Sequence, residues 1–450
     1  MKKSRLFAGA ALCLFGLFQV VAAQEVITPE KLLPGLDAVL KKALTQSPRM
    51  VTRAVELEIA EHSRIAARAG LLPSVGGAYT FYDSRDKRGD LPGRLKVEKE
   101  YYSFSVSQPL FHWGERRNNA RAGAIRKLMA EGAYRDGYRA FAQEIRSVYL
   151  SLIVSKIRAK RAAFQLEHNI RWLKQAEDRH AKKVISDAAI FGTRIETERA
   201  VISAEQAAFN LENAKATLSR LTGEPPLSDD EIPDAIPPVP SQQAAIDRLL
   251  ASYLGASELP THEALNFKRS IQIEKLNLAN QKTRLRPKFT LVAGVSQDEQ
   301  AYGLDIAQKY KVNSRFGGVS VSWSIFDGFA ARSGVRTSLA SLRSMEADLK
   351  AIHDRLTQQA QTQARMAGFY ARYSSINDRL LESGENNVIS VKEQFSRGVI
   401  AQEDVSIVQL GLFDQQINAY MSRADYYAYV SDFLATVAQD PVLANLPNAK

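Results

Sequence analysis

Two stretches in each half of the chain alternate apolar residues with Ser, Thr or Gly at a period of two. They lie at about 73–83 and 101–111 in the first half, and at about 287–298 and 316–326 in the second. The run YYSFSVSQPLF is typical of them. Such alternation over about ten residues marks a strand with one apolar, aromatic face and one polar face. The pattern therefore predicts four strands per chain.

After each strand pair the apolar residues recur at steps of three and four, which is the period of a helix. Residues 113–222 and 329–438 each predict one long helix hairpin, and shorter helices precede each strand pair. Along such a helix the apolar residues form a continuous stripe, or seam, that can pack against another helix. The seam is clearest in the second half, at Leu342, Met345, Leu349, Ile352 and Leu356. A helix of about 68 residues would be about 100 Å long at 1.5 Å per residue. A structural coiled-coil rod explains this seam equally well, but it does not explain the strands.

The same order of elements occurs twice at a constant spacing. Residues 104–106 correspond to 319–321, and the run Val-Ile-Ser at 184–186 recurs as Val-Ile-Ala at 399–401, each 215 positions later. A register held over more than a hundred residues indicates two copies of one structural unit. The predicted organisation is a first repeat at 24–222, a Pro-rich acidic linker at 223–240 and a second repeat at 241–450.

The N-terminus has the features of a secretory signal peptide at residues 1–23: basic residues, an apolar run, and small residues before a cut after Ala23. Cys13, the only cysteine, lies within it, so we expect no disulfide in the mature chain. Three basic and no acidic residues leave with this peptide, and the net charge falls from +11 to +8. That modest charge does not demand a nucleic-acid partner, and we expect none.

Beyond the signal peptide the sequence has no apolar run of about 18 residues, so only strands could enter a membrane. The four predicted strands have the length and the alternation of outer-membrane barrel strands, although a soluble β-sandwich would alternate in the same way. A membrane barrel must close, because lipid offers no partner to an unpaired backbone group. Two chains would give about 8 strands and a filled interior, whereas three would give about 12 and room for a passage. A conducting barrel therefore favours a trimer.

Four passages carry a resemblance to a known family. They are the pair LLPSVGGAYTFY and LRPKFTLVAGVS, the pair QPLFHWGERRNNARAG and WSIFDGFAARSGVRT, the helix turns KVISDAAI and GVIAQEDV, and the repeat end LSRLTGEPP. In their order and spacing, over essentially the whole mature sequence, the chain resembles the TolC family of outer-membrane efflux and secretion channel proteins.

The resemblance implies a mainly α fold with a membrane β part. Three chains would form a 12-stranded β-barrel, with four strands per chain, continued by a long periplasmic α-helical barrel. It also implies a passive exit duct of a tripartite efflux pump or a type I secretion system, located in the outer membrane and extending into the periplasm. The implied partners are two further copies, outer-membrane lipid, a periplasmic adaptor protein and an inner-membrane transporter of the resistance-nodulation (RND) or ABC type.

In the family, the helix tips farthest from the membrane contact the adaptor or transporter and form the gate. By resemblance, the contact residues are Lys183, Val184, Ile185 and Ser186 in the first tip, and Gly398, Val399, Ile400 and Ala401 in the second.

The resemblance also predicts an acidic ring at the gate, but this sequence keeps only part of it. Asp404 falls on the first acidic position of the second tip, and Asp187 lies near the corresponding position of the first. The remaining acidic positions hold Ile407 and Ala189, and Ile400 replaces a frequent Arg. Three copies of Asp404 around a narrow mouth would attract cations. A carboxylate there also suits the first turn of a helix, and the two roles are compatible.

We find no motif of an enzyme, and we expect no catalytic residue, cofactor or metal. The six histidines form no HExxH pair and no close metal pair, and no P-loop, GxSxG or GxGxxG occurs. Two alternatives to a channel stay open from the sequence alone. A soluble periplasmic coiled-coil scaffold or adaptor needs no membrane, and an exported hydrolase would need a cleft constellation that we do not find.

Overall fold

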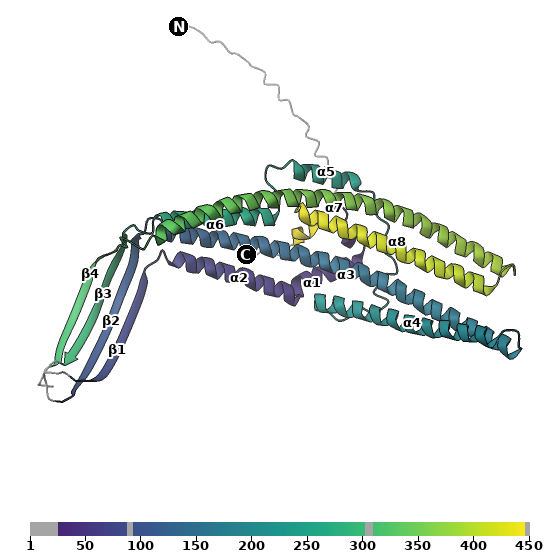
Figure 1. Ribbon diagram of the computed structural model, residues 1–450, viewed down its shortest axis with the longest axis horizontal. Coiled ribbons are helices and arrows are strands. Elements are labelled where there is room, and N and C mark those ends of the chain that lie inside the picture. Colours follow the sequence, from purple (N-terminus) through teal and green to yellow (C-terminus); the bar gives the residue numbers. More distant parts are fainter. Residues whose placement is uncertain (1–25, 88–92, 302–308, 446–450) are drawn as a thin grey trace, which may run out of the picture.

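The computed structural model describes residues 26–87, 93–301 and 309–445. The predicted signal peptide, residues 1–23, lies outside the described residues. The described chain is elongated, with four strands at one end and two helix tips at the other (Figure 1). The strands are β1 (Ser74–Asp86), β2 (Leu95–Phe111), β3 (Lys288–Ala301) and β4 (Lys309–Ser322). The helices are α1 (Pro34–Gln46), α2 (Pro48–Ala69), α3 (Glu115–Ala181), α4 (Asp187–Thr222), α5 (Gln243–Leu254), α6 (His262–Lys282), α7 (Ala330–Ser396) and α8 (Gln402–Thr436), with the short 3-10 helices η1 (Pro29–Lys31) and η2 (Pro441–Asn445).

The strands form one antiparallel sheet in the order β1-β2-β3-β4. All four strands differ in extent from the sequence expectation: β1 and β3 end three residues later than predicted, and β2 and β4 differ more. β2 begins at Leu95, six residues earlier than predicted, and β4 spans Lys309–Ser322, so it begins and ends earlier than the predicted 316–326. The added segments contain charged residues at close intervals, which hides the alternation that identifies a strand with one apolar face.

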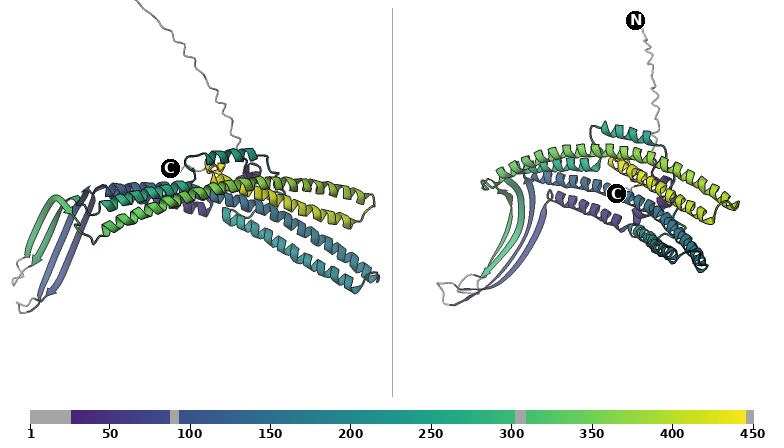
Figure 2. Two further views of the ribbon diagram at one scale, coloured as in Figure 1. Left: turned by 45° about the horizontal axis from the view of Figure 1, so that its top comes forward. Right: turned by 45° about the vertical axis from the view of Figure 1, so that its right-hand side comes forward.

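The helices form a layer built around the two long helices, α3 and α7, which have 67 residues each. Near the strands the neighbours run α2-α3-α6-α7, and toward the tips they run α4-α3-α8-α7 (Figure 2). At 1.5 Å per residue α3 and α7 are each about 100 Å long. Both long helices therefore pass through the whole layer, while the shorter helices fill one half of it each.

The main core lies midway along the long helices, where the N-terminal segment, the linker and the C-terminal segment pack against them. Its largest buried side chains come from α3 and α8, among them Phe141, Tyr149, Tyr426 and Phe433. The segment 223–240 contains no helix or strand, yet it is not loose. Ile232 and Ile236 are buried, and the linker is fixed by its backbone carbonyls.

Two cations from the long helices hold those carbonyls. The ammonium of Lys156 on α3 donates to the carbonyl oxygen of Ile232 at 2.5 Å, and the guanidinium of Arg423 on α8 donates to that of Ile236. Charge-assisted hydrogen bonds of this kind are stronger than neutral ones. The chain between the repeats is thus a packed strap across the middle of the helix layer.

A buried ion cluster joins both ends of the described chain to α3. Arg146 is 2% exposed, and its guanidinium donates to Asp440 at 2.8 Å and to Glu30 at 2.9 Å. Burial lowers the pKa of the Arg146 guanidinium, but the hydrogen bonds and charges of Asp440 and Glu30 outweigh it, and the net direction is upward. The guanidinium therefore stays charged at every pH at which the protein is folded.

We predict that Asp440→Asn destabilises the protein by about 3 kcal/mol, because the buried Arg146 guanidinium loses the charge of Asp440 and at least one of its two hydrogen bonds, and keeps only Glu30 as an ionic partner. Urea unfolding followed by the circular dichroism of the helices measures the loss. Asp37→Asn is the matched control, since the pair Asp37–Lys41 is solvent-accessible and exposed pairs on one helix contribute about 0.5 kcal/mol or less. Equal losses for both variants would mean that the Arg146 cluster contributes nothing special.

Candidate conduit wall and helix tips

One face of the sheet is apolar across its strands. The register places Val75, Val106, Ala293 and Gly317 in one row, and Gly77, Phe104, Val295 and Arg315 in the next. The adjacent row of this face, which lies nearer to the helices than the row of Ala293, contains Leu291 and Val319. Phe104, Leu291 and Val319 are 52%, 44% and 55% exposed, so a broad apolar surface is uncovered in the single chain. An uncovered surface of this kind marks contact with a membrane or a partner.

Aromatic residues bound this apolar face at both ends. Tyr79 and Tyr102 are paired in the row farther from the helices. At the helix end Trp323 is exposed, and its indole N–H donates to the carbonyl oxygen of Leu285 at 2.9 Å. Trp113 lies nearby, with the guanidinium of Arg286 4.6 Å from its ring centre. An apolar band between two aromatic girdles is typical of strands that cross an outer membrane.

The opposite face is small and polar. Its rows include Ser103, Ser296 and Ser314, and on the helix side Ser105 and Gly294. β4 departs from the alternation that we predicted, because Arg315 lies on the apolar face and Phe316 on the polar one. A side chain at Gly294 would meet the ring of Phe316 at 2.8 Å, so this ring covers the glycine and the sheet backbone there.

The first helix tip, between α3 and α4, contains four of the predicted contact residues. Lys183 adopts a left-handed conformation with φ of 57°, and the N–H of Val184 donates to the carbonyl oxygen of Arg179. Ser186 caps α4 by accepting a hydrogen bond from the N–H of Ala189 at 3.3 Å. The side chain of Val184 is 69% exposed.

The second tip, between α7 and α8, repeats this geometry with different residues. Gly398 takes the left-handed position with φ of 72°, and the N–H of Val399 donates to the carbonyl oxygen of Gln394. Val399 is 70% exposed, as its counterpart in the first tip is. Both tips lie at the same end of the molecule (Figure 1). They present an apolar side chain each at equivalent positions.

The two acidic residues predicted at the gate have different local partners. Asp404 is exposed, and its carboxylate accepts a hydrogen bond from the N–H of Ala401 at 3.1 Å, so it caps the first turn of α8. Asp187 pairs with the Nε2 of His180, 2.6 Å away across the first tip. From the sequence, His180 was only one of six histidines that form no metal pair. Its spacing of seven residues from Asp187 across a tight turn was the signal available.

The edges of the helix layer expose further apolar residues. On α4, Ile195, Ile202 and Phe209 repeat every seven residues on the side away from α3, and all three are exposed. On α7, at the opposite edge of the layer, Phe369, Tyr373, Ile376 and Leu380 are exposed at steps of four and three.

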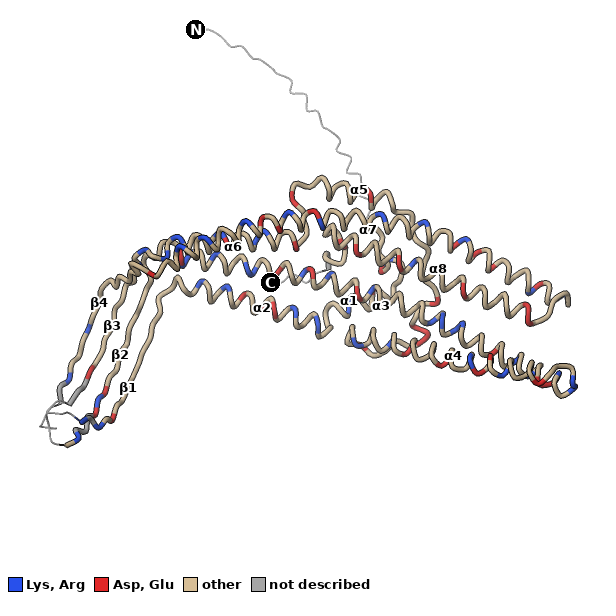
Figure 3. Tube along the Cα trace, in the orientation of Figure 1, with Lys and Arg blue, Asp and Glu red and all other residues tan. Residues whose placement is uncertain are grey.

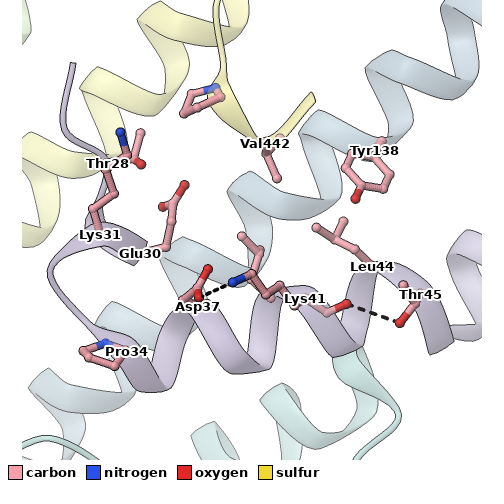
Figure 4. Close-up of a pocket in the computed structure, with 12 residues that line it drawn as sticks. Thr28, Glu30, Lys31, Pro34, Asp37, Lys41, Leu44, Thr45, Tyr138 and Val442 are labelled. Carbon is pink, nitrogen blue, oxygen red and sulfur yellow. Dashed lines mark hydrogen bonds and ion pairs between the residues drawn. The ribbon is translucent and has the colours of Figure 1, made fainter. Parts of the chain in front are cut away.

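A separate cavity of 690 Å³ lies between η1, α1, α3 and η2 (Figure 4). Its lining includes Asp37 and Lys41, which pair with each other at 2.7 Å, and Glu30, which pairs with Arg146. These charges are already compensated, and the cavity lies far from the tips. Among the residues that the structure describes, no three His, Cys, Asp or Glu side chains gather so as to hold a metal ion.

Within the described part of the chain, no helix is both long and apolar enough to cross a membrane.

Comparison with known proteins agrees with this geometry. Residues 39–224 match the family described as outer membrane efflux protein. No curated protein sequence matches the chain significantly. The match to the family confirms the resemblance that the sequence motifs indicated.

Solved structures of outer-membrane channels have a similar fold. The Campylobacter jejuni CmeC outer membrane channel gives a TM-score of 0.69 at 12% identity, covering 99% of this chain and 96% of that chain. The Vibrio cholerae outer membrane protein VceC gives 0.63 at 13% identity, covering 89% and 95%. The Neisseria gonorrhoeae MtrE outer membrane channel, solved in its open state, gives 0.60 at 12% identity, covering 90% and 89%. The predicted fold class, mainly α with a membrane β part, is confirmed.

We predict that Gly398→Ala lowers the protection of the second tip from hydrogen exchange about fivefold, because a left-handed residue with a Cβ costs about 1 kcal/mol or more. No described atom lies within 4 Å of a Cβ at this position, so only backbone strain is introduced. Mass spectrometry of the tip peptides measures the effect. Gly398→Asn is the control and should change protection less, since Asn tolerates the left-handed region. An unchanged exchange rate in Gly398→Ala would show that the tip does not hold this conformation.

Proposed function

Because residues 39–224 match the family of outer membrane efflux proteins, we propose that three copies form a continuous exit duct of a tripartite efflux pump or a type I secretion system. Its location in the outer membrane, predicted from the sequence, is confirmed by the family. The family consists of conduits rather than enzymes. The finer proposal concerns the closed trimer, its partners and its gate.

The observation that carries the proposal is the open sheet with an apolar face. β1 and β4 each have one hydrogen-bonded neighbour within the described chain, so each presents an unpaired backbone edge. Such edges cannot remain in lipid, where each unpaired group costs several kcal/mol. Three sheets joined edge to edge give about 12 strands, which is wide enough for a water-filled passage. The apolar face with its aromatic girdles would then face lipid, and the serine-rich face would line the duct.

The helix layer supports the same assembly. Ile202 lies 15 residues after the start of α4, and Leu380 lies 16 residues before the end of α7. Both are therefore about 23 Å from the tips at 1.5 Å per residue. The exposed stripe on α4 and the one on α7 therefore overlap in height on opposite edges of the layer, and the α4 of one copy can pack against the α7 of its neighbour there. A soluble scaffold, the alternative from the sequence, would leave the apolar sheet face uncovered.

We assign the two tips to contact with a periplasmic adaptor and an inner-membrane transporter of the RND or ABC type. Val184 and Val399 support this assignment, because they are exposed apolar side chains at the end of the duct with no described partner. In the trimer they would form a ring of six similar contacts. The copies of Asp404 and Asp187 would together surround the mouth of the duct and favour cations there.

We predict that Ile202→Glu greatly reduces the trimer fraction, because the charge would be buried between α4 and the neighbouring α7, at a cost of several kcal/mol. Unheated gel electrophoresis and light scattering in detergent measure the trimer. Val184→Glu adds the same charge at a similarly exposed site on the tip and should leave the trimer intact. A full trimer yield in Ile202→Glu would remove α4 from the subunit interface.

We also predict that Asp404→Asn lowers the preference of the channel for K⁺ over Cl⁻ about twofold or more, since the carboxylate ring is lost. The amide oxygen of Asn can still accept the hydrogen bond from the N–H of Ala401, so the tip should keep its fold. Reversal potentials in planar bilayers measure the preference. Glu403→Gln removes a neighbouring acid of the same helix turn and should change it less. A selectivity unchanged by Asp404→Asn would place that residue away from the constriction.

A further inference from the structure

The helix ends nearest the strands are strongly basic. Residues 115–127 contain five basic residues and one acid, residues 275–288 contain five basic residues and no acid, and residues 330–343 contain three and none. The charged positions gather visibly where the helices meet the sheet (Figure 3). Basic and acidic residues alternate along most of the remaining helices, so this accumulation requires its own explanation.

Four of these arginines are equivalent by the repeat. Arg117 and Arg121 lie in the first two turns of α3, and Arg332 and Arg336 lie at the same positions of α7, 215 residues later. All four are exposed. None of them has a carboxylate within ion-pair distance in the described parts of the chain, whereas neighbouring cations such as Lys288, paired with Glu115, do.

The contacts of α3 show which way its two arginines point. Asn118 faces α6, where its amide donates to Asn280 at 2.8 Å, and Gly123 faces α2, where a Cβ would meet the Cβ of Ala67 at 2.6 Å. At about 100° per residue these two directions are about 140° apart. These two directions divide the circumference of α3 into a smaller and a larger sector. Arg117 and Arg121 lie in the larger sector. In a closed ring of helices the smaller sector faces the interior, so both arginines face the outside.

The equivalent face of α7 follows the same rule. Ser338, the counterpart of Gly123, is 8% exposed and so also faces a neighbouring helix. Arg332 and Arg336 therefore lie outside as well. Six copies of each position would form two outer rings, one helical turn apart.

The depth of the rings matches the surface of the membrane. The first ring begins three residues into helices that start directly after the apolar strand face and its tryptophans. At 1.5 Å per residue the two rings lie within about 10 Å of the helix starts, and the headgroup region of a bilayer extends about 5–8 Å beyond the hydrocarbon on each side. Guanidinium groups bind phosphate through paired hydrogen bonds.

We propose that Arg117, Arg121, Arg332 and Arg336 bind the phosphate groups of anionic phospholipids in the inner leaflet of the outer membrane. The rings would add to the aromatic girdles in fixing the height and tilt of the duct in the bilayer. This inference rests on the closed trimer proposed above, which decides the outer side of the helix layer. Anionic cargo inside the duct is the competing occupant, and the test separates it.

The test uses the full-length channel reconstituted in phosphatidylcholine vesicles with trace spin-labelled phosphatidylglycerol or phosphatidylcholine. Electron spin resonance gives the relative affinity of each lipid for the protein surface. The wild-type channel should prefer the anionic lipid several-fold, about fivefold for each contacted headgroup, and the preference should fall with salt. The variant R117Q/R121Q/R332Q/R336Q should lose most of it.

Arg135→Gln with Lys350→Gln is the matched control. These residues lie 18 positions further along the same faces of α3 and α7, and both are exposed. They are therefore about 27 Å farther from the membrane at 1.5 Å per residue, and their loss should leave lipid preference unchanged.

Two results would overturn the proposal. The first is a wild-type channel without preference for phosphatidylglycerol, a measurement that needs no variant to fold. The second is a quadruple variant that keeps the lipid preference but shifts the reversal potential, because the arginines would then line the passage. Either result can come from an intact, conducting trimer, so failure here is distinct from failure of the exit-duct proposal, which would show as the absence of trimer or conductance.

Discussion

The absence of water in the hydrocarbon of a membrane is the constraint on which the rest of this structure depends. A backbone group in that medium must find its partner within protein, and a sheet of four strands leaves two edges that cannot do so alone. The apolar face of the sheet, the aromatic girdles and the exposed edges of the helix layer are what joining such sheets into the proposed closed wall requires. The chain is consequently an incomplete object by itself, with its membrane face and the edges of its helix layer exposed in the monomer.

The internal duplication lets one chain supply two similar units of such a wall. Each repeat contributes two strands and one long helix hairpin, and the linker does more than connect them. Ile232 and Ile236 are buried, and cations from α3 and α8 hold their carbonyl oxygens. With the cluster around Arg146, which joins both ends of the described chain, the strap keeps the two hairpins in register at mid-length.

Segments in which one face strongly prefers an apolar environment could be predicted from the sequence. Strands with one apolar face and helices with a continuous seam repeat at fixed periods, and the faces at Phe104 and Val319 were assigned correctly. The extension of β2 to Leu95 was missed because Lys and Glu occupy four of its six added positions. The Arg146 cluster was missed for another reason: its three members are separated by more than a hundred residues, and no local pattern announces a buried ion pair. Ile232 was hidden in a Pro-rich stretch whose composition suggested an open linker.

At the tips, the positions of the predicted residues followed from the repeat, but the pairing of Asp187 with His180 required the geometry of the turn itself. The inversion of polarity at Arg315 and Phe316 has a counterpart 215 residues earlier, where Glu100 lies on the apolar face and Tyr101 on the polar one. The first repeat therefore offered a signal for it.

The connection between the two middle strands has a consequence for the order of folding. β1 pairs with β2 and β3 with β4 through short connections, but Phe104 of β2 lies opposite Val295 of β3, 191 positions away in the chain. Loop-closure entropy makes so distant a pairing slow unless the intervening chain is already compact. The helix hairpin and the strap lie within that interval, so their assembly shortens the effective loop. The water-exposed body should therefore fold before the sheet is complete, and the membrane strands would be brought together by a scaffold that has already formed.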